Sequence, residues 1–245
     1  MRQIKLKSTV IALLVGFALL QTSCAALLWN NCLEVEGKII TESRKTNTFT
    51  SIYLNIPANV YVSQGLPQEI KITAKEGVLR QIETMVMDGV LEIEYDTCVS
   101  NPDSIKIYIT IQTIHKLRIN GLGDISTLYG ITADDLVLEN NGSGDIKVEA
   151  NATKIINKIN GSGDIKLSGS SKTLQIVING SGDIYALDAP TENCIIKING
   201  SGDCKVFVKT SLEVKVNGSG NIDYQGSPDV STSIIGSGTV KKLVN

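Results

Sequence analysis

The sequence predicts an all-β protein: a right-handed β-solenoid (β-helix) of roughly 20-residue coils, with a strand-rich N-terminal half. Three observations predict this fold. A Gly-rich phrase recurs along the second half, strand-type alternation stands on both sides of each copy, and helical periodicity is missing there. With 245 residues, of which 42% are hydrophobic, the chain can bury a sizeable core, which excludes a globally disordered protein.

The recurring phrase is Asn-Gly-Ser-Gly-Asp-Ile. It first occurs as Asn-Gly-Leu-Gly-Asp-Ile, and the seven copies begin at Asn120, Asn141, Asn160, Asn179, Asn199, Asn217 and Ile235. The spacings between copies are 21, 19, 19, 20, 18 and 18 residues. A constant period of this size is typical of repeat architectures, in which each unit stacks on the next.

Each copy lies between two strand-like segments. Before one corner, Leu212, Val214 and Val216 alternate with Glu213 and Lys215, so that one face is apolar. The Asn-Gly pair supplies residues that tolerate the positive φ of a tight corner. An antiparallel meander of hairpins and a β-solenoid both fit this pattern. The solenoid is favoured because stacking at about 4.8 Å places each corner residue beside its own copy, which explains why the corners are nearly identical.

The half before the repeats predicts further strands and one short helix. Residues 54–62 indicate strand, corner and strand, with Pro57 at the corner. Residues 78–87 predict a helix because Leu79, Ile82 and Val86 share a helical face. Alternation predicts three more strands, at residues 69–74, 90–95 and 105–114. Because no linker divides the two halves, we expect a single domain over residues 47–245.

The N-terminus predicts export and a lipid anchor. Arg2, Lys5 and Lys7 precede an apolar run at residues 10–20, which is typical of a secretory signal and short for a membrane span. The following Leu-Gln-Thr-Ser-Cys resembles a relaxed bacterial lipobox, with Cys24 as the lipid attachment residue. An ordinary signal peptide with a buried Cys24 is the alternative.

These features divide the start of the chain into a signal peptide at residues 1–23 and a tether at residues 24–46. Several acyl chains on one cysteine would hold the protein on the membrane as an outer-membrane lipoprotein, secreted across the inner membrane. Residues 25–29 carry no acidic cluster, so the surface and periplasmic orientations both stay open. Removal of the signal takes three positive charges and lowers the formal net charge from −2 to −5. This charge, with only 4% aromatic residues, argues against a nucleic-acid partner.

Several segments together carry a family resemblance. They are Phe-Thr-Ser-Ile at 49–52, Val-Tyr-Val-Ser-Gln-Gly at 60–65, Leu-Arg-Gln-Ile at 79–82, Gly-Val-Leu-Glu-Ile at 89–93 and the repeated Asn-Gly-Ser-Gly-Asp-Ile phrase. In this order they resemble the head GIN-domain family, described as putative autotransporter adhesins, over about residues 47–228. The resemblance implies a β-helical, non-enzymatic envelope protein and adhesion as its function, without naming a ligand or binding residues.

Three functions are compatible with these features. The preferred one is binding of a glycan or a protein at the cell surface, because a solenoid offers long regular faces for repeated weak contacts. The second is a structural envelope scaffold without a ligand of its own. The third is a β-helix enzyme acting on polysaccharide, which is disfavoured because the acidic residues are periodic and the single histidine, His115, is expected to be exposed.

A row of aspartates is the sharpest candidate site. Five copies of the phrase hold Asp at the same position: Asp124, Asp145, Asp164, Asp183 and Asp203. Stacked carboxylates repel one another unless they are compensated, either by Ca²⁺ or by backbone N–H groups of their own Gly-Ser-Gly turn. The turn cap is favoured because the spacing differs from the period of nine in calcium-binding β-rolls. No metal site or cofactor is therefore assigned, and Ca²⁺ stays open.

Four cysteines follow Cys24. Cys194 and Cys204 are both expected to face inward, but at strand rise they lie about 13 Å apart along the coil, too far for a disulfide. We expect them to be unpaired core residues. Pairing of Cys32 with Cys98 is allowed by an oxidising compartment and stays open.

Overall fold

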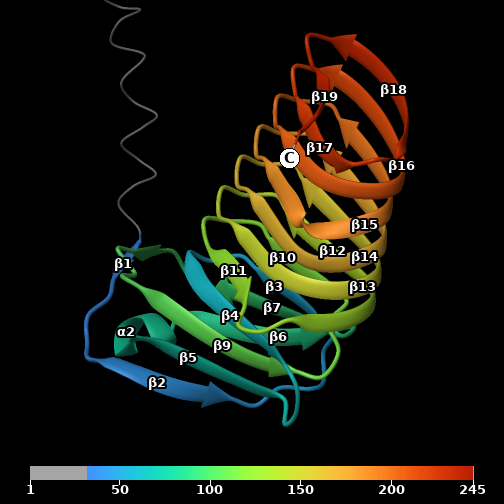
Figure 1. The fold of residues 1–245 in the computed structure, drawn as a ribbon. Coiled ribbons are helices and arrows are strands. Elements are labelled where there is room, and N and C mark those ends of the chain that lie inside the picture. The colour runs from blue at the N-terminus through green and yellow to red at the C-terminus, as the bar shows by residue number, and fades with distance from the viewer. Residues whose placement is uncertain (1–31, 245) are drawn as a thin grey trace, which may run out of the picture.

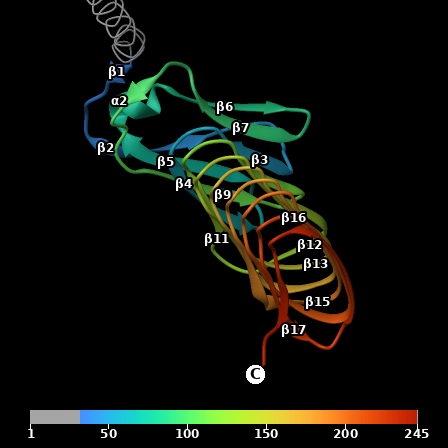
Figure 2. The same ribbon diagram turned by 90° about the horizontal axis from the view of Figure 1, so that it is seen from above.

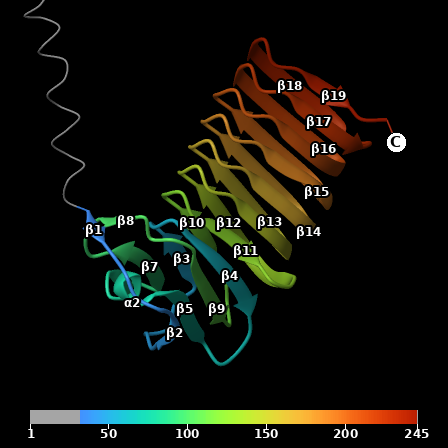
Figure 3. The same ribbon diagram turned by 90° about the vertical axis from the view of Figure 1, so that its left-hand side faces the viewer.

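The computed structural model describes residues 32–244 and confirms the β-solenoid (Figure 1). Successive coils pair in parallel along the stack, which excludes the meander; Ile155 pairs with Leu174 of the next coil, for example. Figure 3 shows the coils stacked one on another from β10 to β19. The strands of this part are β10 (Lys116–Ile119), β11 (Asp124–Thr127), β12 (Ile131–Asn140), β13 (Ile146–Ile159), β14 (Ile165–Ile178), β15 (Ile184–Ile198), β16 (Cys204–Gly218), β17 (Ile222–Gly226), β18 (Asp229–Gly236) and β19 (Val240–Lys242).

Each coil has two principal walls joined by the Asn-Gly-Ser-Gly corner. The pre-corner wall consists of the segments that run into the corners, and the post-corner wall of those that leave them. The long strands β13 to β16 contribute to both walls, because each continues from one corner to the next. Along both walls alternate side chains point inward, and most of these are fully buried Ile, Leu and Val. The core is therefore a stack of aliphatic layers.

The corners stack backbone on backbone. The N–H of Ser162 donates to the carbonyl of Gly142 in the preceding coil at 3.0 Å. A Cβ on Gly161 would lie 1.9 Å from that same carbonyl oxygen, so only glycine allows this approach. Gly121 stacks on the corner of the first coil, which has a different sequence. The nearest atom to a Cβ added there is the carbonyl oxygen of Asn55 at 3.5 Å. For the first glycine of the phrase, the requirement thus arises when one repeated corner stacks on another.

The first coil is built by residues well before the repeats. β3 (Ser51–Leu54) and β4 (Ala58–Gln64) pair in parallel with β10 and β11, with Pro57 at the corner between them, as predicted. β7 (Val90–Tyr95) pairs in parallel with β3, and β9 (Ile105–Ile111) with β4, which adds another layer to each wall.

Antiparallel strands then close this end, which we call the head. β6 (Ile82–Met87) pairs with β7, while β5 (Glu69–Lys75) pairs with β9 and also with β2 (Ile39–Arg44). Figure 2 shows β6 and β7 side by side at the head. The opposite end differs: all eight residues of β18 are exposed.

The predicted helix at 78–87 is wrong over most of its length. Only α2 (Glu76–Leu79) is helical, and Ile82–Met87 forms β6. Asp88 and Gly89, with φ of 49° and 75°, make a tight turn of the kind that joins two strands. The apolar residues fit both periods, and pairing with β7 decides between them.

The segment expected to be a tether takes part in the fold where it is described. β1 (Leu33–Glu34) pairs with β8 (Val99–Ser100), and β2 joins the sheet. A disulfide between Cys32 and Cys98 fixes β1 to the head. The predicted signal peptide and Cys24 lie outside the described residues. Among the described helices, none is long and apolar enough to cross a membrane.

Candidate functional site

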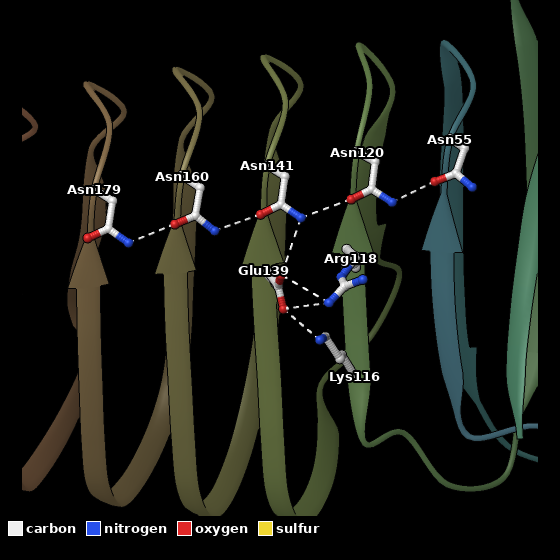
Figure 4. Close-up of polar contacts among 8 residues, drawn as sticks. All are labelled: Asn55, Lys116, Arg118, Asn120, Glu139, Asn141, Asn160 and Asn179. Atoms are coloured by element: carbon white, nitrogen blue, oxygen red, sulfur yellow. Dashed lines mark hydrogen bonds and ion pairs between the residues drawn. The ribbon is translucent and has the colours of Figure 1, made fainter. Parts of the chain in front are cut away.

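The repeated asparagines form a ladder along one edge of the corners. Each side-chain amide donates to the amide oxygen of the preceding coil, as for Asn160 to Asn141 at 2.7 Å (Figure 4). Asn55 of the first coil accepts from Asn120 at 2.7 Å, so the ladder begins in the head. Its described members are Asn55, Asn120, Asn141, Asn160, Asn179 and Asn199. Because each asparagine from Asn120 to Asn179 donates to one neighbour and accepts from the other, the ladder holds the coils together.

The predicted aspartates also stack, but their partners differ from the expected ones. Oδ1 of Asp145 accepts the backbone N–H of Asp164 in the following coil at 2.9 Å. The same bond repeats from Asp124 to Asp203, whose Oδ1 accepts from the N–H of Asn221 at 2.7 Å. The carboxylates therefore join neighbouring coils, whereas we expected them to cap their own turns.

This geometry accounts for the aspartates without a metal. In residues 32–244 no group of three or more His, Cys, Asp or Glu side chains is arranged to hold a metal ion. Calcium binding at Asp124, Asp145, Asp164, Asp183 and Asp203, the less favoured alternative, stays untested. His115, the single histidine, is exposed at the start of the second coil.

A second polar cluster lies where the head meets the repeats. Glu139 is 8% exposed and forms ion pairs with Lys116 at 2.5 Å and Arg118 at 3.1 Å (Figure 4). Arg118 also covers the ring of Tyr53, 4.2 Å from its centroid. Burial by itself would raise the pKa of Glu139, but hydrogen bonds from Lys116 and Asn141 and the two positive charges lower it below its usual range. Lys116 and Arg118 together compensate the charge of Glu139, although Arg118 Nε is buried without a hydrogen-bond partner among the described residues. The cluster thus ties β3, β10 and β12 together.

The two cysteines of the repeats lie in the core. Cys194 pairs in register with Leu174 and Leu212, and both Cys194 and Cys204 are buried and free, as predicted. Burial raises the pKa of both thiols. Neither thiol is placed for chemistry at the surface.

The outer surface of the post-corner wall carries a row of cationic and aromatic side chains. In successive coils the same position holds Lys147, Lys166, Tyr185 and Lys205. The hydroxyl of Tyr185 donates to Asp183 at 3.0 Å, and this bond raises the pKa of Tyr185. Nearer the head, Ser126 interrupts the row, and Tyr61 and Tyr108 hold the same position beyond it, with stacked rings whose centroids are 5.0 Å apart.

A surface hollow of about 340 Å³ opens beside this row. The three lysines and Tyr185 border it, together with Leu167 and Leu187. Here the regular register is lost, because β14 and β15 shift between Lys166 and Ser171, and β15 and β16 shift again beyond Ala186. The hollow is the strongest candidate binding site among the described residues.

Sequence reasoning missed this site, although two signals pointed to it. The spacing from Asn179 to Asn199 is 20 residues between neighbours of 19 and 18, and Pro190 interrupts the strand pattern in the same coil. The extra residues of this coil have no partners in the regular backbone pairing with the neighbouring coils. They produce the register shift beside the hollow.

Comparison with known proteins agrees with this architecture. The family model described as "Putative auto-transporter adhesin, head GIN domain" matches residues 48–228. The chain belongs to this family. The match covers the head except β1 and β2, the first coil and the repeats as far as β17, so the head GIN domain includes both the irregular and the periodic parts.

Solved structures show the same head GIN fold. A putative adhesin from Bacteroides fragilis NCTC 9343 is 28% identical, with a TM-score of 0.83 over 86% of this chain and 100% of that one. A putative lipid binding protein from Parabacteroides distasonis ATCC 8503 is 21% identical, with a TM-score of 0.71 over 86% and 100% of the two chains. A putative adhesin from Parabacteroides merdae ATCC 43184 is 22% identical, with a TM-score of 0.69 over 86% and 99%. The search of curated proteins found no match.

Proposed function

We propose that this head GIN protein is a lipid-anchored, non-enzymatic adhesin of the outer membrane that binds a glycan or a protein at the cell surface. Family membership supports the adhesive function. The observation that carries the proposal is the placement of the two ends. Cys32 and β1 belong to the head, and the last coil lies at the opposite end of the stack (Figure 1).

This placement suits a protein held at its N-terminus. Cys24 precedes the disulfide-bonded Cys32 by only eight residues, so acyl chains on it would keep the head near the membrane. The coil walls would then extend away from the lipid, where a partner can reach them. The long regular wall offers many equivalent contacts, which favours binding by summed weak interactions.

The test is protease shaving of intact cells, with immunodetection of the protein and a periplasmic control protein. We expect the protein to be digested while the control survives. A Cys24→Ala variant is expected to leave the membrane fraction and to lose incorporation of a radiolabelled fatty acid, whereas the matched Cys194→Ala variant keeps both.

Adhesion is then measured by comparing wild-type cells with cells lacking the protein on mucin-coated and matrix-coated surfaces. Fewer bound cells in the absence of the protein are expected. Protection from protease until the outer membrane is broken contradicts a surface adhesin and favours a periplasmic scaffold. Unchanged fractionation of Cys24→Ala contradicts the lipid anchor alone.

A further inference from the structure

We propose that the hollow on the post-corner wall is a binding site for an acidic oligosaccharide, with Lys147, Lys166 and Lys205 holding its anionic groups and Tyr185 packing against a sugar ring. The inference rests on the proposed adhesin function and names the class of ligand. It is carried by the register of four strands and by the break in that register.

The first argument is the spacing of the charges. Lys147 and Lys166 are direct neighbours, and Lys205 follows one coil beyond Tyr185. Neighbouring coils are about 4.8 Å apart, so the three lysines occupy one backbone position along the stack, on a line parallel to its axis. An acidic polysaccharide repeats its charge along an extended chain. It can therefore contact several of these lysines at once, which a single small anion cannot do.

The second argument is the aromatic ring in the middle of this line. Tyr185 is half-buried, and its hydroxyl is held by Asp183 at 3.0 Å, so the ring has a fixed position. Lys166 Nζ lies 5.8 Å from the ring centroid. A fixed ring beside cations combines an apolar surface with charge, which matches a sugar ring that carries a carboxylate or sulfate.

The third argument is the shape and lining of the hollow. Leu167 and Leu187 supply its apolar part, and Asp188 is the one acidic residue among its main lining residues. A volume of about 340 Å³ lies at the small end of the range for ligand sites and suits one or two sugar units. The surplus of positive charge at the border favours an anion over a neutral sugar.

The neighbouring aspartates reduce this charge only in part. Asp223 follows Lys205 at the same position of the next coil, so the positive charge is concentrated at Lys147 and Lys166. Each of Asp145, Asp164 and Asp183 uses Oδ1 to accept the backbone N–H of the next coil, which partly compensates its charge. Lysine side chains are longer than aspartate side chains, so their ammonium groups reach farther from the wall.

The experiment measures binding of purified full-length protein by calorimetry. The probes are an oligogalacturonate, a heparin-derived oligosaccharide of similar length, a neutral cello-oligosaccharide and phosphatidylglycerol vesicles. At least one acidic probe is expected to bind, more weakly as salt rises, while the neutral probe binds at least about tenfold more weakly.

Variants place the ligand on the protein. Lys147→Gln/Lys166→Gln is expected to weaken binding more than about tenfold, because two charge-assisted contacts are lost. The matched control, Lys172→Gln/Lys197→Gln, removes the same charge from exposed residues outside the hollow and is expected to bind as wild type. Tyr185→Leu is expected to weaken binding because the aromatic ring is lost. Tyr185→Phe is expected to keep most of the wild-type affinity because it keeps the ring.

Three results would overturn the inference: no binding of either acidic probe, equal loss in both lysine pairs, or binding only to phosphatidylglycerol vesicles, which would make the site a lipid site. Each of these results can be distinguished from a failure of the proposed adhesin function. Protease protection of intact cells together with specific oligosaccharide binding would reject the surface location and leave the site in place. Shaving and cell adhesion without oligosaccharide binding would reject the site alone.

Discussion

The head and the repeats extend the same parallel walls by different means. In the repeats, each coil places Asn, Gly and Asp beside their own copies, and the contacts between coils recur from one layer to the next. In the head, β7 and β9 extend the walls with unlike sequences, and antiparallel strands and a disulfide close the end. The repeats therefore depend on identical residues at each step, while the head depends on particular long-range pairings.

The largest expected effect tests the glycine requirement within one motif. Gly161→Ala brings a Cβ to 1.9 Å from the carbonyl oxygen of Gly142. Neither coil can move away without breaking the hydrogen bonds that join the two corners. We expect a loss of more than about 4 kcal/mol in the free energy of unfolding, or failure to fold. Gly121→Ala, with its nearest contact at 3.5 Å, is expected to stay within about 1 kcal/mol of wild type. Denaturant unfolding measures both, and equal losses would contradict the stacked-corner argument.

The disulfide tests the head. Cys32 and Cys98 are 66 residues apart in the sequence, so their bond restricts a long loop of the unfolded chain. Cys32→Ser/Cys98→Ser is expected to lower the free energy of unfolding by about 3 kcal/mol. A reductant should lower the melting temperature of wild type and leave that of the variant unchanged. A wild type insensitive to reductant would show that β1 contributes nothing to the stability of the head.

Two buried asparagines in neighbouring coils sharpen the comparison. Asn140 and Asn157 are both fully buried. The side chain of Asn140 donates to the carbonyl of Gly144 at 2.6 Å and accepts the N–H of Gly142, whereas the side-chain amide of Asn157 makes no hydrogen bond within residues 32–244. Asn157 lies in register between Leu138 and Ile176, so Asn157→Leu completes an aliphatic row.

We expect Asn157→Leu to raise the free energy of unfolding by about 1–2 kcal/mol, because an unpaired amide is removed from the core. Asn140→Leu is the matched control and should lower it by a similar amount, since it leaves the corner groups unpaired. Thermal and denaturant unfolding give both values. A destabilised Asn157→Leu protein would show that this amide has a partner in solution.

The smallest effect concerns the junction of the two regions. Because its folded-state pKa is lowered, Glu139 contributes stability above its unfolded-state pKa, and this contribution is lost as pH falls through the folded-state pKa. We expect Glu139→Gln to cost about 1 kcal/mol at neutral pH and progressively less below about pH 4. Unfolding between pH 3 and pH 7 measures it, with Glu192→Gln, at an exposed residue, as control. A pH-independent difference would argue against the ion pairs as its source.

The sequence was sufficient for the repeats because each residue contacts its own copy one period away. The period, the corner glycines, the inward Cys194 and Cys204 and the parallel stack all followed from the repeated phrase. The strands at 90–95 and 69–74 could also be predicted from the sequence, because alternation of apolar and polar residues indicates a strand whatever its partner.

Only the tertiary structure decided how the unlike pieces meet. It determined that Ile82–Met87 pairs as a strand, that Cys32 joins Cys98, and that the register breaks beside the hollow at Tyr185. The physical reason is that these contacts join segments with no shared pattern. Local propensity leaves several partners open, and only the packed chain selects one.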